Sequence, residues 1–179
     1  INDSKRNIES YHDWLVLRET VDVTTVSGTR NYNLSSGQEI KIIDVINQTQ
    51  GNQLIQVSRQ YINSAKYPNE NSGDPLYYAF NGADSSNNLK IDFEPKPNSV
   101  QTITFDIVKP QAELATATTV LKIPEKPVIL AAWARAISER GEDGGTQSSV
   151  VGFEMKEALN QAIILDSGNV RFEHDWFVN

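Results

Sequence analysis

The sequence predicts an α+β protein, in which an antiparallel β sandwich or barrel is inserted between the first and second helices of a small bundle. Two observations support this class. Apolar residues recur at helical spacing near the beginning of the chain and again over residues 127–165. Between these zones, short segments rich in β-branched and aromatic residues alternate with turn signals. We expect residues 1–20 and 122–179 to form the bundle, with a C-terminal tail at 169–179, and residues 21–121 to form the β domain.

The beginning of the chain has the pattern of an amphipathic helix. Asn2, Asp3 and Ser4 offer side chains that can cap a helix N-terminus. The apolar residues that follow at helical spacing are Ile8, Tyr11, Trp14, Leu15 and Leu17. We expect one helix here, with Trp14 in the protein core.

The middle of the chain reads as a series of strands. Six segments have strand composition: Val21–Val26, Ile40–Ile46, Gln53–Ser58, Leu76–Gly82, Leu89–Pro95 and Gln101–Pro110. Ser27 and Gly28 are a turn signal, so a hairpin is expected between the first segment and the "RNYNL" that follows. A short helix at Arg59–Lys66 and an exposed loop reaching Pro75 interrupt the series. This pattern is typical of an antiparallel sandwich or barrel.

Two further helices are predicted in the last third of the chain. Pro127 suits the first position of one helix, and Gly141 suits its end. Its apolar stripe is Ile129, Ala132, Trp133, Ala136 and Ile137, and we expect Trp133 to be a core residue. The stripe of the second helix is Val151, Met155, Ala158, Leu159, Ala162 and Ile163. Because the connection between them is short, the two helices should be antiparallel neighbours.

Composition and charge argue against several classes of function. With 16 basic and 23 acidic residues the formal net charge is −7, which does not suit a surface that grips nucleic acid. The chain has no cysteine, so disulfides, thiol catalysis and cysteine-bound zinc are excluded. No run of about 18 apolar residues is present, so no membrane-spanning helix is expected.

The connection "GEDGG" between the two last helices raises the question of an acidic active site. Paired carboxylates can act as acid and base when a rigid cleft holds them; the candidates are Glu139, Glu142 and Asp143. Glycines next to acids are more typical of a sharp helix corner, here formed by Gly141, Gly144 and Gly145. We favour the corner and keep an enzyme that uses these acids as the last-ranked alternative.

No metal or cofactor site is expected. His12 and His174 are far apart in the sequence, and "EHD" around His174 has no second histidine-rich segment to complete a ligand set. The stretch "GADSSNN" at 82–88 lacks the spaced acids of a calcium loop and reads as a hairpin turn.

Two surfaces are candidates for binding a partner. The tail carries exposed-looking residues that could dock on another protein or fold back on their own chain: Arg171, Phe172, Trp176 and Phe177. Alternatively, the β domain could bind carbohydrate or another ligand through its tyrosines, which are Tyr32, Tyr61, Tyr67, Tyr77 and Tyr78. Strand alternation places Tyr77 and Tyr78 on opposite faces, so only one of them could contribute to such a site.

The order of several motifs resembles the head-to-tail adaptor proteins of short-tailed and related phages. These motifs are a tryptophan-containing helix followed by "TVDVTTVSGTRNYNL", then "KIIDVIN", "PLYYAFNG" and "IDFEPKP", and finally "VLKIPEKPVILAAWARAISERGEDGG". Together they extend over nearly the whole chain.

The resemblance implies a structural, non-enzymatic virion protein without cofactors. In that family, copies form a ring, usually a dodecamer, that docks on the portal protein, extends the DNA channel and presents a platform for tail or nozzle proteins. Genomic DNA would pass through without sequence-specific binding, and no membrane would be involved. The protein would reside at the portal–tail junction of the virion and in the host cytoplasm during assembly, with the aromatic tail available to dock on the portal.

Overall fold

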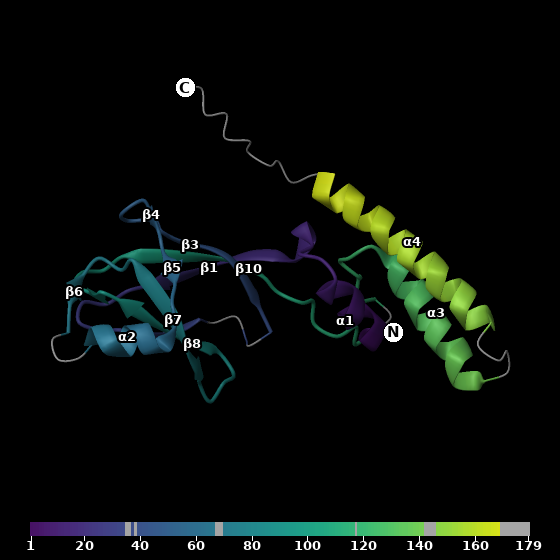
Figure 1. Cartoon of the computed structure of the whole chain (residues 1–179), viewed down its shortest axis with the longest axis horizontal. Coiled ribbons are helices and arrows are strands. Elements are labelled where there is room, and N and C mark those ends of the chain that lie inside the picture. Colours follow the sequence, from purple (N-terminus) through teal and green to yellow (C-terminus); the bar gives the residue numbers. More distant parts are fainter. Residues whose placement is uncertain (35–36, 38, 67–69, 117, 142–145, 169–179) are drawn as a thin grey trace, which may run out of the picture. The chain divides into compact units, whose positions relative to one another are not determined.

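The computed structural model describes residues 1–34, 37, 39–66, 70–116, 118–141 and 146–168. Its internal contacts divide the chain into a helical unit, made of Ile1–Leu17 and Pro110–Asn179, and a β unit, Arg18–Lys109. The boundaries expected from the sequence are 20/21 and 121/122. The α+β class is confirmed, because the β unit is inserted between the first and second helices of the helical unit (Figure 1).

The helical unit contains three α-helices and one turn of 3₁₀-helix among its described residues. These are α1 (Asn2–Ser10), η1 (Leu15–Leu17), α3 (Glu125–Arg140) and α4 (Thr146–Gly168). Helices α3 and α4 lie side by side and run antiparallel, as the short connection predicts, and α1 packs against α3 (Figure 1). Helix α3 begins two residues before Pro127, with Pro124 at its N-cap. Gly141 ends α3 in the left-handed conformation, with φ of 66°.

The first helix is shorter than its apolar spacing predicts. It ends at Ser10, and the expected capping by Asn2, Asp3 or Ser4 is absent, because Ile1 is the N-cap and makes no side-chain cap bond. Trp14 is fully buried, as expected, but not as part of the helix. Its indole Nε1 donates a hydrogen bond to the Ile8 carbonyl, at 3.1 Å. The chain therefore turns back, and Trp14 gives a second hydrogen bond to a carbonyl at the helix end that already accepts one from the Tyr11 backbone N–H.

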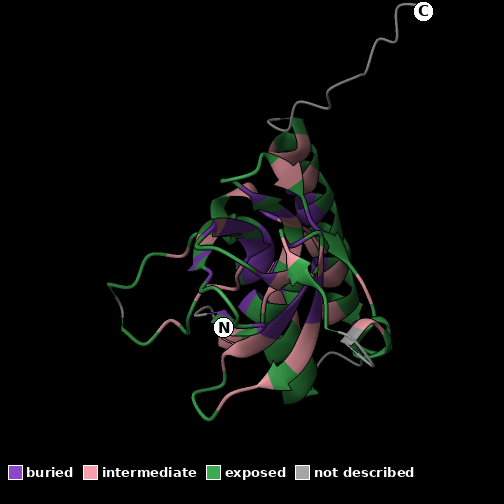
Figure 2. Ribbon diagram, turned by 90° about the vertical axis from the view of Figure 1, so that its left-hand side faces the viewer, coloured by how far each residue is buried: buried purple, intermediate pink, exposed green. Residues whose placement is uncertain are grey.

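The β unit is a sandwich of two four-stranded sheets. In the first, the order is β1 (Arg18–Thr24), β10 (Thr102–Val108), β3 (Lys41–Asn47) and β4 (Asn52–Gln53). In the second, it is β2 (Asn31–Leu34), β8 (Leu89–Glu94), β7 (Tyr77–Ala83) and β5 (Ile55–Gln56). All pairs within them are antiparallel except β5 with β7. Alternate residues of both sheets meet in one core, which includes Ile91, Phe93, Ile103 and Phe105. Figure 2 colours the buried residues purple and the exposed residues green.

Two strand predictions are corrected by the pairing. Strands β1 and β2 do not form a hairpin, because β1 pairs with β10 and β2 pairs with β8 in the other sheet. Gly28, with φ of 79°, lies in the turn that carries the chain from one sheet to the other. The segment Gln53–Ser58 is also not one strand: Leu54 is buried where the chain passes from β4 in the first sheet to β5 in the second.

Helix α2 (Arg59–Lys66) forms where the sequence predicts it, and it packs on β7 and β8. The chain then returns through β6 (Ser72–Gly73), which pairs in parallel with β9 (Lys96–Pro97). Beside this pair, Glu70 accepts hydrogen bonds from Lys96 Nζ at 2.8 Å and from Arg30 Nε at 3.2 Å. Arg30 is buried and also pairs with the buried Glu94. These ion pairs attach the loop after α2 to the second sheet.

Candidate functional site

Helix α3 carries large apolar side chains on a face that nothing in the described helical unit covers. Ile129 is exposed, and the side chain of Trp133 is 54% exposed, so the prediction that Trp133 is a core residue is wrong. The fully buried residues of α3 are Pro127 and Val128. Successive helical residues lie about 100° apart, so Ile129, Trp133 and Arg140 fall on one line along the helix. We call the line of Ile129, Trp133, Ala136 and Arg140 the outer face of α3.

The inner stripe of α4 is largely as predicted. Val151, Ala158, Leu159 and Ala162 are buried, and Met155 and Ile163 are partly buried. The opposite side of α4 is also rich in apolar residues: Phe153 and Ile164 are each 70% exposed, and Val150 is exposed too. The exposed acids Glu154 and Glu157 lie between them along the helix. We call the line of Val150, Phe153, Glu157 and Ile164 the outer face of α4.

These two outer faces are unusual because they leave large apolar side chains of the described helical unit exposed. A helix that is apolar on more than one side is normally buried on more than one side. Fully burying a side chain such as Phe, Ile or Leu stabilises a protein by roughly 1.5–3 kcal/mol. Clustered exposed apolar residues therefore indicate a surface that binds another protein.

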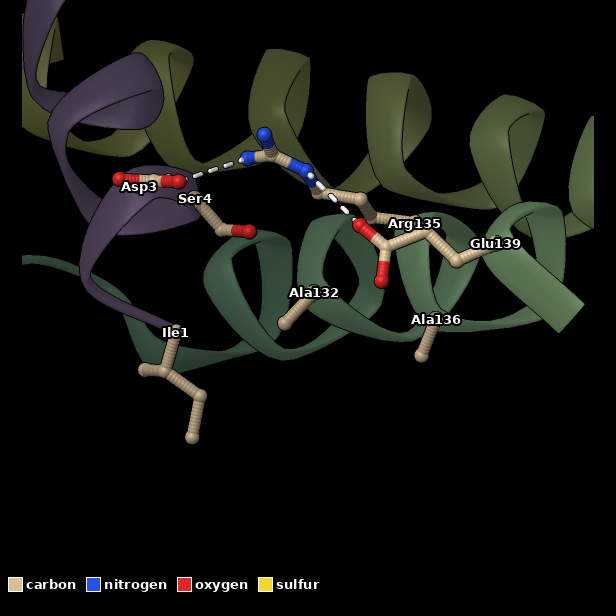
Figure 3. Close-up of a pocket in the computed structure, with 7 residues that line it drawn as sticks. All are labelled: Ile1, Asp3, Ser4, Ala132, Arg135, Ala136 and Glu139. Atoms are coloured by element: carbon tan, nitrogen blue, oxygen red, sulfur yellow. Dashed lines mark ion pairs between the residues drawn. The ribbon is translucent and has the colours of Figure 1, made fainter.

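A hollow of about 280 Å³ lies beside the outer face of α3, where α1 approaches the helix (Figure 3). Ile1, Ala132 and Ala136 point to the same side in this view. Arg135 reaches along the helix between two acids, with nitrogen–oxygen distances of 3.3 Å to Asp3 and 3.7 Å to Glu139. The other lining residue is Ser4. The hollow has small side chains and paired charges at its edge, without an arrangement suited to catalysis.

The connection from the β unit to α3 is held against α1 by a buried ion pair. Lys5 Nζ donates to both carboxylate oxygens of Glu9, at 3.0 and 2.9 Å, and to the carbonyl of Gln111. Glu9 in turn accepts a hydrogen bond from the Gln111 backbone N–H, at 3.1 Å. A buried charge is tolerated when its partners satisfy it in this way. The pair thereby fixes α1 to the beginning of this connection, at Gln111.

A second contact holds the C-terminal end of α4. Asp166 Oδ2 lies 2.9 Å from His12 Nε2 and accepts a hydrogen bond from the Leu15 backbone N–H, at 3.2 Å. The His12 ring meets Trp14 edge to face, with centroids 5.0 Å apart. His12 is therefore part of the packing that holds the last turn of α4.

The remaining site candidates divide into those the structure describes and those it does not. Within the helix corner, Gly141 has the positive φ that its proposed role requires, and Glu139 pairs with Arg135. The other members of the corner and all candidates of the tail lie outside the described residues: Glu142, Asp143, Gly144, Gly145, Arg171, Phe172, His174, Trp176 and Phe177. No group of three potential metal ligands occurs among the residues that the structure describes.

The hairpin tip at residues 84–88 uses its one acid to stabilise the turn. Asp84 Oδ1 accepts hydrogen bonds from the backbone N–H groups of Ser86 and Asn88, both at 2.8 Å. These bonds, led by the one from Asn88, lower the pKa of Asp84 below its ordinary value. The carboxylate is therefore engaged in the turn itself, as expected for a hairpin loop.

The described tyrosines do not form a shared platform for a sugar. Tyr78 is buried in the core, whereas Tyr77 lies on the other side of β7, where its ring meets Tyr61 edge to face at 5.3 Å. The hydroxyl of Tyr32 donates to the backbone of the turn at 26–29 and accepts a hydrogen bond from the Val26 N–H. Tyr67 lies outside the described residues. Stacking on sugars needs several aromatic faces on one surface. The four described tyrosines of this set do not provide such a surface; they are Tyr32, Tyr61, Tyr77 and Tyr78.

Sequence reasoning missed the outer face of α4 and the role of Asp166. The signal for the outer face was present, because Val150, Phe153 and Ile164 are apolar residues outside the predicted inner stripe. Asp166 carries no such signal, since its partners His12 and Leu15 are about 150 residues away in the sequence.

The chain matches the model of a known protein family. The model of a protein family described as SU10 adaptor protein matches residues 1–171, which is nearly the whole chain. No curated protein sequence matches the chain. In the part of the chain that the structure describes, no helix is long and apolar enough to cross a membrane. The chain belongs to the SU10 adaptor protein family, a family of structural adaptor proteins of phage virions.

Proposed function

We propose that this protein is the subunit of a ring that joins the portal to the tail. In this proposal the ring docks on the portal, extends the DNA channel and gives tail or nozzle proteins their attachment site. The observation that carries the proposal is the pair of outer faces on α3 and α4, which leave large apolar residues exposed in a chain of an adaptor family. A closed ring of identical copies would cover such faces on every subunit.

The charge of the chain supports the same proposal. A net charge of −7 would repel DNA, which suits a conduit through which a genome must pass without being held. Sequence-specific binding would instead require basic side chains placed against phosphates and bases.

We assign the two units to different tasks. The helical unit would form the ring and face the portal, with Arg171, Phe172, Trp176 and Phe177 of the tail docking on the portal. The β unit would face neighbouring copies and tail proteins through its loops, in particular the hairpin tip at 84–88.

The portal-binding role of the tail can be tested by truncation. A chain that ends at Gly168 keeps every described residue of α4 and should remain folded, but it should not bind portal rings of the same phage in a pull-down. A chain with Phe172, Trp176 and Phe177 replaced by serine should behave in the same way, whereas Val178→Ser should bind. Normal portal binding by the truncated chain would contradict the assignment of the tail.

A further inference from the structure

We propose that the outer face of α3 on one copy binds the outer face of α4 on the next copy, in a head-to-tail contact. This inference rests on the ring that we propose above and specifies how its subunits meet. The two faces have different residues: α3 presents Trp133 and Arg140, whereas α4 presents Glu157 and Ile164. Because the faces differ, the contact is heterologous when each copy places its two faces against two different neighbours, and repeating it then generates a ring or a filament. Two copies that exchanged both contacts with each other would instead close as a dimer, which the mass of the associated species distinguishes.

The direction of the helices fixes how the two faces would align. Within one copy, α3 and α4 are antiparallel (Figure 1). If every copy has the same orientation about a ring axis, α4 of one copy also runs antiparallel to α3 of the next. Residues along the two outer faces then meet in opposite sequence order.

The spacing of apolar and charged residues matches in this arrangement. Trp133 and Arg140 are seven residues apart on α3, and Glu157 and Ile164 are seven residues apart on α4. Seven residues correspond to about 10 Å of helix, or nearly two turns, so each pair stays on one face. In one antiparallel register, Trp133 of one copy meets Ile164 of the next where Arg140 meets Glu157. This register is displaced by about ten residues, or about 15 Å, from that of the helix pair within one copy, so it requires helices that are inclined to the ring axis.

This register places opposite charges together and buries two exposed apolar side chains. Arg140 and Glu157 are both exposed in the single chain, and so are Trp133 and Ile164. Between Trp133 and Arg140, the outer face of α3 has only the methyl group of Ala136, and the adjoining hollow is lined by Ala132 (Figure 3). Small side chains at this point let a second helix approach closely. A second copy of the chain therefore matches this surface in charge and polarity.

Charge reversal tests the contact directly. We expect the full chain to associate at high concentration in sedimentation velocity experiments. Arg140→Glu or Glu157→Arg alone should raise the concentration needed for association by at least about tenfold, because each places like charges opposite one another. Both substitutions in one chain should restore association. Lys122→Glu, which makes the same charge change outside the helices, serves as the matched control and should associate normally.

A mixture of the two single variants distinguishes this contact from a symmetric one. In a mixture, the new carboxylate on α3 of the Arg140→Glu chain can face the new guanidinium on α4 of the Glu157→Arg chain. The α3 face of the second variant and the α4 face of the first keep their original charges. An equimolar mixture should therefore associate, although neither variant does so alone. A contact between two α3 faces would leave the Glu157→Arg chain able to associate alone, and a contact between two α4 faces would do the same for Arg140→Glu; either result would overturn the proposal.

Other outcomes separate this inference from the proposed function. A full chain that stays monomeric at all concentrations overturns the head-to-tail contact, even if it binds portal rings. If deletion of residues 169–179 turns such a monomer into an associating chain, the tail covers the outer face and the assignment to a second copy is wrong. Association that follows the charge pattern, together with no portal binding, would support the contact and contradict the adaptor role.

Discussion

The two tryptophans of the helical unit show how differently one residue type can be used. Trp14 is fully buried and bonded to the Ile8 carbonyl, whereas Trp133 is 54% exposed on the outer face of α3. Both lie in apolar patterns that predict helix in the sequence. The pattern indicates that a side chain will be covered, but it does not say whether the same chain or another copy covers it.

Replacing each tryptophan by alanine should separate these roles. Trp14→Ala leaves a large cavity and should lower the free energy of unfolding by about 3–5 kcal/mol. Trp133→Ala should cost the single chain only about 1 kcal/mol or less, because its surroundings are mostly solvent. Urea denaturation at low protein concentration measures both values. Equal losses for the two variants would mean that Trp133 is packed within its own chain.

Glu70 gives the β unit a dependence on acid pH. The hydrogen bond from Lys96, followed by the charges of Lys96 and Arg30, lowers the pKa of Glu70 below its ordinary value of 4.5. A carboxyl group with a lowered pKa contributes stability that is present above the ordinary pKa and is lost as the pH falls through the folded-state pKa. The contribution of Glu70 should therefore be complete at neutral pH and disappear below pH 4.5.

The variant Glu70→Gln isolates this contribution. Its stability should change less than that of the original chain when thermal unfolding is followed from pH 6 down to about pH 3, since it lacks the titrating group. Parallel curves for the two proteins would show that the ion pairs of Glu70 do not stabilise the fold.

Helix α1 acts as a clamp on the connection that leads to α3. Lys5 and Glu9 hold the Gln111 backbone from the buried side, while the exposed pair of Arg6 and Glu113 lies further along the connection. Removing one member of a buried ion pair leaves an uncompensated charge, whereas an exposed pair contributes little.

The two pairs make a matched comparison. Lys5→Met should destabilise the chain by about 3–5 kcal/mol, and Arg6→Met by less than about 1 kcal/mol. In the Lys5→Met chain, hydrogen exchange should be faster at the Gln111 N–H, which bonds to Glu9. If Lys5→Met leaves exchange in the connection unchanged, α1 does not act as the clamp.

The elements themselves were largely predictable, and their partners were not. Strands β3, β7, β8 and β10, helix α2 and the inner stripe of α4 follow from local periodicity and turn residues. The false hairpin of β1 and β2 shows the limit: a Ser-Gly turn is compatible with a hairpin and with a crossing between sheets, and only distant strands β8 and β10 decide between them. The early end of α1 has the same cause, since the burial of Trp14 prevails over helical spacing.

For the candidate site, too, the sequence predicts the apolar pattern but not what covers it. The sequence identifies the apolar line through Ile129 and Trp133 but assigns it to the core, because a periodic pattern contains no information on which molecule lies opposite. The hydrogen bonds of Asp166 to His12 and Leu15 could not be predicted, since they join residues that only the folded chain brings together.

On the scale of the whole molecule, the β unit is a module whose two ends lie together. Arg18 and Val108 are paired in neighbouring strands β1 and β10, so the chain leaves the helical unit and returns to it at the same place. This geometry lets a helical unit keep its own packing while carrying a large insertion. We infer that the two units can serve different partners, one for ring formation and one for contact with the tail.

The most direct test of the adaptor role is mass photometry of the full-length chain, alone and mixed with portal rings of the same phage. The ring proposal predicts a discrete increase in the mass of the portal ring that equals a whole number of chains and saturates at one closed ring. Portal rings whose mass does not change over the full range of added protein would contradict it.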